Sequence, residues 1–177
     1  MIVRLATLVD LNACLSLDHT SMTDHVWQMK VSEGESEIGV TFHTQRLPRQ
    51  MRVGYPRDLE QLVTDWNQKA GFLVAEVDGE VRGYVDLLPL PWQQMAWAAN
   101  LAVDPAYRRQ GIAAGLLRHA SQWTRDQGLL GILVEATTKN YPALCLYHKL
   151  RFEFCGFNDH YYFNQDIALF FVQMLRK

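Results

Sequence analysis

The sequence has little that would set it apart from an ordinary water-soluble domain. Its longest apolar runs fall well short of the ~20 residues that a membrane-spanning helix needs. Lysine and arginine together number 17 and acidic residues 19, so no overall charge attracts the chain to nucleic acid or to an anionic membrane. We therefore expect neither nucleic acid nor a membrane among its partners.

Cysteine and metal-binding patterns are equally scarce. The three cysteines form no CxxC pair, and Met1–Asp10 alternates polar and apolar residues where a secretory signal would be continuously apolar. We therefore expect a reducing, cytoplasmic environment. The six histidines show no HExxH or similar spacing, so we expect no metal site.

What remains is a chain with the size and apolar content of one domain. Its 177 residues are 49% hydrophobic, enough for a full core without disulfides or metals, and a single domain over 1–177 is predicted. Asp78-Gly79 is the strongest hairpin signal. Strands are predicted at 1–5, 72–77, 81–88, 95–103, 129–136, 152–157 and 167–175, and helices after Thr7, after Asp58, from Gly111 to Gly128 and over 141–150. This order favours the α/β (α+β) class, with a mixed, largely antiparallel sheet covered by helices.

The segment 103–115 is the sharpest functional signal. It joins a strand end at Val103 to a loop with Arg108 and Arg109 and to a helix that begins near Gly111. The first turn of a helix has free backbone amides and a positive dipole end, where phosphate oxygens can bind. The alternative is a solvated turn before an amphipathic helix whose small residues only pack closely.

Two motifs here resemble the GNAT superfamily of acetyltransferases. Arg108-x-x-Gly111-x-Ala113 is similar to its CoA-binding motif, directly after a hydrophobic strand. The run 133–152 is similar to its next strand and helix, with Asn140-x-x-Ala143-x-x-x-Tyr147-x-x-x-x-Phe152. Both matches occur in the expected order, over about 80 residues from Met95 onward. The resemblance implies a GNAT fold, with a central sheet of about seven strands flanked by helices.

One position departs from the family pattern. Arg151 stands where the family usually has glycine, and an arginine in a left-handed cap would cost roughly 1–2 kcal/mol. We therefore expect the helix to end in another way.

The resemblance also implies a cosubstrate, acetyl-CoA, and residues that bind it. The backbone of the strand end would pair with the pantetheine arm, the loop and helix start would hold the pyrophosphate, and Asn140 would bond the CoA arm or cap its helix, or both. The implied cofactor-binding residues are Leu101, Ala102, Val103, Arg108, Arg109, Gln110, Gly111, Ile112, Ala113, Asn140 and Tyr147.

The same resemblance implies catalytic residues for direct acetyl transfer to an amine. Tyr147 would act as the general acid toward the CoA sulfur, the alternative being a core tyrosine. Glu135 is the candidate general base, since ribosomal-protein N-terminal alanine acetyltransferases and streptothricin acetyltransferases have a glutamate on this strand; the alternative is a surface-facing glutamate. Asp159 and Asp166 are weaker candidates. Tyr161 and Tyr162 resemble tyrosines that border the acceptor site in these two groups.

The acceptor remains open. The segment 26–47 predicts a hairpin or loop on the acceptor side, where a polar stretch, 32–37, separates two apolar ones. Arginines and aromatic residues nearby could form an acceptor lip, a homodimer surface or a solvated loop: Arg46, Arg49, Arg52, Arg57, Trp27, Phe42 and Tyr55. We expect an acetyltransferase for a small-molecule amine, ahead of a peptide N-terminus. The rival is a non-catalytic acyl-CoA-binding sensor, which would not need Tyr147 or Glu135.

Overall fold

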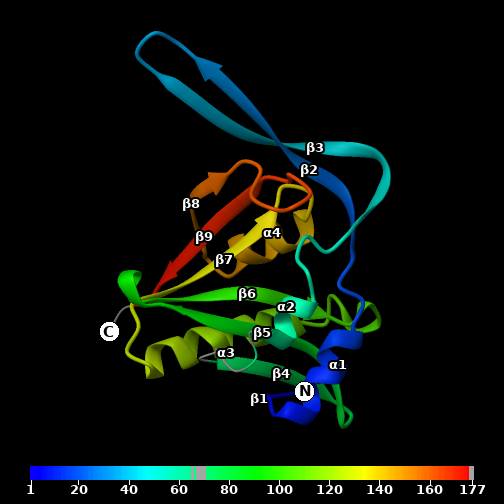
Figure 1. Ribbon diagram of the computed structural model, residues 1–177. Coiled ribbons are helices and arrows are strands. Elements are labelled where there is room, and N and C mark those ends of the chain that lie inside the picture. The colour runs from blue at the N-terminus through cyan, green and yellow to red at the C-terminus, as the bar shows by residue number, and fades with distance from the viewer. Residues whose placement is uncertain (65, 67–70, 176–177) are drawn as a thin grey trace.

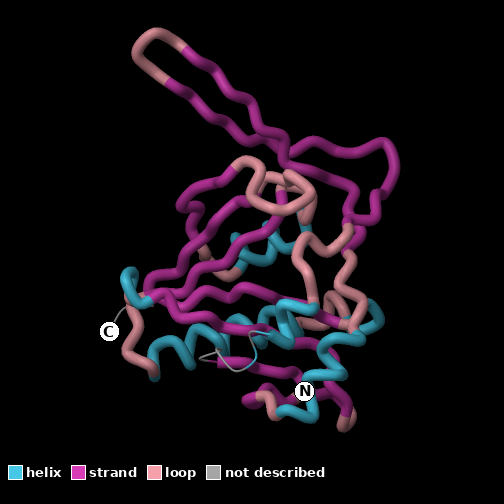
Figure 2. The backbone as a smooth tube through the Cα atoms, in the orientation of Figure 1, coloured by secondary structure: helices cyan, strands magenta, loops and turns pink. Residues whose placement is uncertain are grey.

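A mixed seven-stranded sheet forms the body of the molecule, and a separate two-stranded sheet projects from it (Figures 1 and 2). The computed structural model describes residues 1–64, 66 and 71–175. The elements are β1 (Ile2–Leu5), α1 (Leu11–Ser16), β2 (Ser21–Glu33), β3 (Ile38–Val53), α2 (Glu60–Thr64), β4 (Gly71–Val77), β5 (Glu80–Leu90), β6 (Met95–Val103), α3 (Ile112–Asp126), β7 (Gly131–Thr137), α4 (Tyr141–Lys149), β8 (Glu153–Asn158) and β9 (Ala168–Met174).

The large sheet has the order β1-β4-β5-β6-β7-β9-β8. Its neighbours pair antiparallel except β6 and β7, which run parallel. The parallel pair is joined through α3, as a crossover connection requires. The predicted class, a mixed and mostly antiparallel sheet with helices, is confirmed.

Helices cover both faces of this sheet. On one face α3 and α4 bury a core that includes Leu116, Leu144 and Val134. On the other face α1 and α2 pack through Leu11 and Leu62, with Phe72 of β4 and Tyr84 of β5. Because successive side chains of a strand point to opposite faces of the sheet, each polar residue of a central strand also lies on one face or the other.

Local sequence explains several of the boundaries. Asp78 and Gly79 both take positive φ, 53° and 82°, as the tight hairpin between β4 and β5 needs. Gly128, at φ 71°, ends α3. Asp58 accepts a hydrogen bond from the Glu60 amide at 2.9 Å and caps α2. The predicted end of that helix near Gly71 lies outside the described residues, which omit 65 and 67–70.

The hairpin β2–β3 extends further than the sequence indicates and is anchored at its base (Figure 1). The Trp27 amide donates to the carbonyl of Thr138 at 2.9 Å, and the Trp27 indole stacks on His148. Phe42 packs edge-on against Phe157. Trp27 and Phe42 therefore pack the β2–β3 hairpin against α4 and β8. The solvated-loop alternative is wrong for these two residues.

The expectation about Arg151 is wrong. Arg151 adopts φ 62°, the left-handed cap conformation that usually selects glycine. The cap still forms, because the amide of Phe152 bonds the Tyr147 carbonyl at 3.0 Å and that of Arg151 bonds the His148 carbonyl at 3.0 Å. These bonds, together with the buried Phe152 ring, hold the Arg151 backbone in a conformation that residues other than glycine disfavour.

Among the helices of the described residues, none combines the length and the apolar character needed to cross a membrane.

Replacing Arg151 with glycine is expected to stabilise the protein. Glycine relieves the strain of the left-handed backbone, but it also increases the entropy of the unfolded chain, which offsets part of the gain. The net effect is an increase of about 0.5–1 kcal/mol in the free energy of unfolding. Urea denaturation of the variant measures the change. Arg151→Ala is the matched control, because it removes the same side chain and keeps the strain; an equal gain in the control would contradict this explanation.

Candidate active site

The site lies where the two central parallel strands separate. Pairing between β6 and β7 runs only from Met95 with Gly131 to Ala98 with Val134. Beyond it, β6 continues beside β5 and β7 beside β9. Ala99 is an extra residue in β6, a bulge that bends the strand. A cavity of about 80 Å³ opens here. Its lining includes Ala98, Ala99, Leu101, Glu135, Ala136, Thr137, Asn140, Ala143 and Tyr147.

Glu135 is the charged residue that β7 contributes to this cavity. Its neighbours Val134 and Ala136 belong to the core beneath α3 and α4, so its carboxylate lies on the opposite face. The side chain is only 2% exposed. Burial raises the pKa of Glu135, while Arg57 and Trp97 act against that shift. The surface-facing alternative for Glu135 is therefore wrong.

Both carboxylate oxygens of Glu135 have partners. Arg57 donates to Oε1 at 2.5 Å, and the Trp97 indole donates to Oε2 at 2.5 Å. The guanidinium also lies 4.7 Å from the centre of the Trp97 ring. Leaving such a buried carboxylate without its arginine would cost about 3–5 kcal/mol. Burial by itself would lower the pKa of Arg57, but the neighbouring Glu135 raises it, so Arg57 is a cation at neutral pH.

Tyr147 approaches the same residue from the other face. Its hydroxyl donates to the backbone carbonyl of Glu135 at 3.1 Å, and its ring packs against Phe152 and Phe171. Burial raises the pKa of Tyr147, so the phenol keeps its proton at neutral pH. Tyr147 is a core tyrosine that also forms part of the cavity wall, and its role as general acid stays a prediction.

The two predicted acceptor tyrosines lie beside Arg57, the partner of Glu135. The guanidinium of Arg57 lies 5.9 Å from the centre of the Tyr161 ring and 5.8 Å from that of Tyr162. The weaker base candidates lie elsewhere. Asp166 pairs with Lys139, and Asp159 accepts from the amide of His160; neither lines the cavity.

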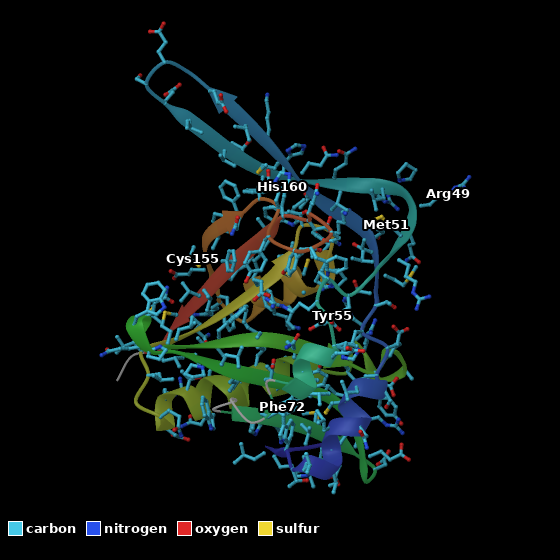
Figure 3. The ribbon with its side chains drawn as sticks, in the orientation of Figure 1. Arg49, Met51, Tyr55, Phe72, Cys155 and His160 are labelled. Carbon is cyan, nitrogen blue, oxygen red and sulfur yellow. The ribbon has the colours of Figure 1, made fainter. Side chains whose placement is uncertain are left out.

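On the β5–β6 side, the cavity residues Tyr55 and His19 belong to a polar group. The Tyr55 hydroxyl donates to the Asn100 side chain, and Asn100 donates to the buried carboxylate of Asp86 from its backbone at 2.6 Å and its side chain at 3.0 Å. His19 bonds the Tyr84 hydroxyl at 2.9 Å. Figure 3 shows Tyr55 between the β7–β9 part of the sheet and the β5–β6 part.

The sequence pointed to Tyr55 and Arg57 only as members of a possible acceptor lip, and Asp86, Asn100 and Trp97 were missed. A signal existed for two of them. Asp86 is a charged residue within the apolar run of β5, and Trp97 is a large ring among the alanines of β6. Nothing in the sequence, however, pairs Arg57 with Glu135, which comes 78 residues later.

The start of α3 has the geometry that an anion site needs. Gly111 precedes the helix at φ 89°, and a Cβ atom there would meet nothing within 4 Å. The first hydrogen bond of the helix runs from the Gly115 amide to the Gly111 carbonyl at 2.9 Å. The amides of Ile112 and Ala113 thus precede the helical ladder, where a phosphate oxygen can accept from them.

The side chains before that helix have different tasks. Arg108 donates to the Val103 carbonyl at 2.8 Å and to the Asp18 carbonyl at 2.7 Å, so it ties the end of β6 to the loop before β2. Gln110 bonds back to the Ala106 carbonyl at 3.3 Å. Arg109 has φ 65°. The Arg108 guanidinium is therefore engaged by backbone carbonyls, and the amides at the start of α3 are better placed than Arg108 to bind an anion.

Asn140 acts as the cap of α4. Its side-chain oxygen accepts from the Ala143 amide at 3.3 Å, and it also lines the cavity. Within the described residues, no group of three or more His, Cys, Asp or Glu side chains is arranged to hold a metal ion.

Comparison with known proteins agrees with this geometry. Residues 41–152 match the Acetyltransferase (GNAT) family. The chain belongs to the GNAT family. Among GNAT relatives, streptothricin acetyltransferase of Streptomyces lavendulae is 31% identical over 91 residues, which cover 51% of this chain and 48% of that protein. A putative [ribosomal protein bS18]-alanine N-acetyltransferase of Bacillus subtilis is 32% identical over 98 residues, 54% and 62% of the two chains.

Solved GNAT structures share the whole fold. Nourseothricin acetyltransferase superposes with a TM-score of 0.85 at 22% identity, covering 99% of this chain and 98% of that one. A putative streptothricin acetyltransferase from Bacillus anthracis, in complex with acetyl coenzyme A, has a TM-score of 0.80 at 18% identity over 99% and 98%. The chain spans about half the length of the first curated relatives it matches. The predicted family and fold are confirmed.

Proposed function

We propose that this chain transfers the acetyl group of acetyl-CoA to a primary amine by direct attack within a ternary complex. The observation that carries this proposal is the convergence at residue 135 of a buried carboxylate on one face of β7 and the Tyr147 hydroxyl on the other. A base on the acceptor side and a proton donor on the cosubstrate side are what amine acetylation requires.

Each part of the site has a task in this reaction. The separated edge of β6, with Leu101, Ala102 and Val103, offers backbone groups to the pantetheine arm and the thioester carbonyl. The amides around Gly111 to Ala113 hold the pyrophosphate. Glu135 takes the proton of the acceptor amine, and Tyr147 donates to the departing sulfur. A non-catalytic sensor would need only the first two of these parts.

A small-molecule amine is the favoured acceptor. Trp97 and Tyr162 lie around the ion pair of Arg57 and Glu135, and a site so enclosed suits a short, unhindered amine. Two of the relatives named above are streptothricin acetyltransferases. A peptide N-terminus is the second candidate, because another relative is named as a ribosomal-protein alanine N-acetyltransferase.

Release of CoA thiol from acetyl-CoA, measured across a panel of amines, tests this function. The panel pairs small primary amines with peptides that have free N-termini, and mass spectrometry of the products identifies the acetylated nitrogen. We expect turnover with small primary amines. Turnover with peptides alone would replace the small-molecule acceptor, and tight acetyl-CoA binding without turnover of any amine would support the sensor.

Replacing Gly111 with glutamate is expected to weaken CoA binding severely. The new carboxylate would stand beside the pyrophosphate, and loss of the anion contacts would weaken binding by about 3 kcal/mol or more, roughly 100-fold. Calorimetry with CoA measures the affinity. Gly111→Asn is the control, since asparagine tolerates positive φ and adds no charge; equal losses in both variants would assign the effect to the backbone and contradict the phosphate placement.

Replacing Tyr147 with phenylalanine is expected to slow turnover by about 100-fold and to leave acetyl-CoA affinity nearly unchanged. The ring contacts with Phe152 and Phe171 persist, and only the hydroxyl is lost. Steady-state kinetics and calorimetry separate the two effects. Unchanged turnover would remove Tyr147 from the role of proton donor.

A further inference from the structure

The carboxylate proposed as the base cannot be reached by an acceptor while Arg57 stays in place. Arg57 occupies Oε1 of Glu135, Trp97 occupies Oε2, and the Glu135 side chain is 2% exposed. Arg57 itself is 26% exposed and lies on the outer side of this pair. An amine that gives its proton to Glu135 therefore has to take the position of the guanidinium.

The surroundings of the guanidinium are suited to cations in general. Three aromatic rings and one carboxylate enclose it, and we call Glu135, Trp97, Tyr161 and Tyr162 the cation cage. Aromatic faces attract ammonium and guanidinium ions alike. A neutral or anionic group that replaced Arg57 would leave a buried carboxylate without a counter-charge, so only a cation can enter in its place.

The backbone around Arg57 permits such an exchange. Arg57 lies between the end of β3 at Val53 and the start of α2 at Glu60. Outside the helices and strands of the described residues, no backbone-to-backbone hydrogen bond involves residues 54–58. Tyr55 is fixed through its hydroxyl to Asn100, so Arg57 can swing outward while Tyr55 keeps the segment attached.

We propose that the cation cage is the binding site for the ammonium group of the acceptor, and that Arg57 fills it as an internal place-holder until the acceptor arrives. This inference rests on the proposed acetyltransferase function and names the acceptor class, an unhindered primary amine that binds as its cation. Primary alkyl amines are protonated at neutral pH, as the reference pKa of lysine, about 10.4, indicates.

Exchange of the two cations also prepares the reaction. Once Arg57 leaves, the ammonium is the only counter-ion of Oε1. One N–H proton then passes to the Glu135 carboxylate, which becomes a neutral acid, and the nitrogen keeps its electron pair for attack on the thioester carbon. Charge, atoms and electrons balance, and the products of the proton transfer are both uncharged, which a buried site favours.

Removing the place-holder tests the proposal. In Arg57→Ala we expect the KM for the amine that the parent chain acetylates fastest to fall ~10-fold, because a competitor that fills the cage most of the time is gone. The fall in KM for the amine, and not kcat, is the diagnostic readout. Methylguanidinium should then inhibit the variant competitively with the amine and have little effect on the parent chain.

A fixed positioning role for Arg57 gives the opposite result. Turnover of Arg57→Ala would collapse, and methylguanidinium would restore it instead of inhibiting it; that outcome would overturn the proposal. Arg57→Gln, which keeps most of the side-chain volume, repeats the measurement if the alanine variant folds poorly. Arg49→Ala is the matched control, an exposed arginine of β3 that points away from the body of the molecule (Figure 3), and the KM of this variant should equal that of the parent.

Failure of the cage and failure of the acetyltransferase function are distinguishable. If the parent chain acetylates no amine, calorimetry still measures methylguanidinium binding to Arg57→Ala and to Arg57→Ala with Glu135→Gln. Binding by the first and not by the second supports a cation site that Arg57 fills. No binding by the first, in a variant that still binds acetyl-CoA, overturns the cage.

Discussion

The structure depends on one interruption of its hydrogen-bond ladder. Two central strands, β6 and β7, pair over four residues each and then part. Backbone amides and carbonyls in the middle of a sheet require partners, so the separated edges must be satisfied by something other than each other. Two of the partners are side chains: Tyr147 donates to the Glu135 carbonyl and Arg108 to the Val103 carbonyl. A pantetheine arm, which carries amide groups of its own, suits the remaining edge.

The same interruption decides which residues form the site. Past the point of separation, alternation along β7 sends Glu135 to one face and Ala136 to the other. The bulge at Ala99 shifts the alternation of β6 and places Asn100 on the same face as Tyr84 and the carboxylate of Asp86. Helices α3 and α4 cover the opposite face. In the proposed reaction the cosubstrate and the acceptor would therefore reach one opening from different sides of the sheet, an arrangement that suits a ternary complex.

Sequence reasoning succeeded where the signal is local. The hairpin at Asp78-Gly79, the end of α3 at Gly128 and the class of the sheet follow from turn chemistry and periodicity over short windows. It failed for Arg151, because the penalty for a left-handed arginine is smaller than the bonds and the buried Phe152 ring that hold the cap. It also missed the pairing of Arg57 with Glu135, since a contact between distant segments leaves no periodic trace.

Arg108 belongs to a motif that identifies the family correctly, yet its side chain has a structural role. Arg108 opens the motif that resembles the CoA-binding pattern, and its charge just before a helix start suggests an anion ligand. Its guanidinium instead bonds two backbone carbonyls, one at the end of β6 and one in the loop before β2, and burial lowers its pKa. Those bonds fix the strand end from which the loop before α3 departs. Charge in such a motif therefore does not by itself identify a ligand: the backbone of the loop offers the donors, and the arginine sets where that backbone lies.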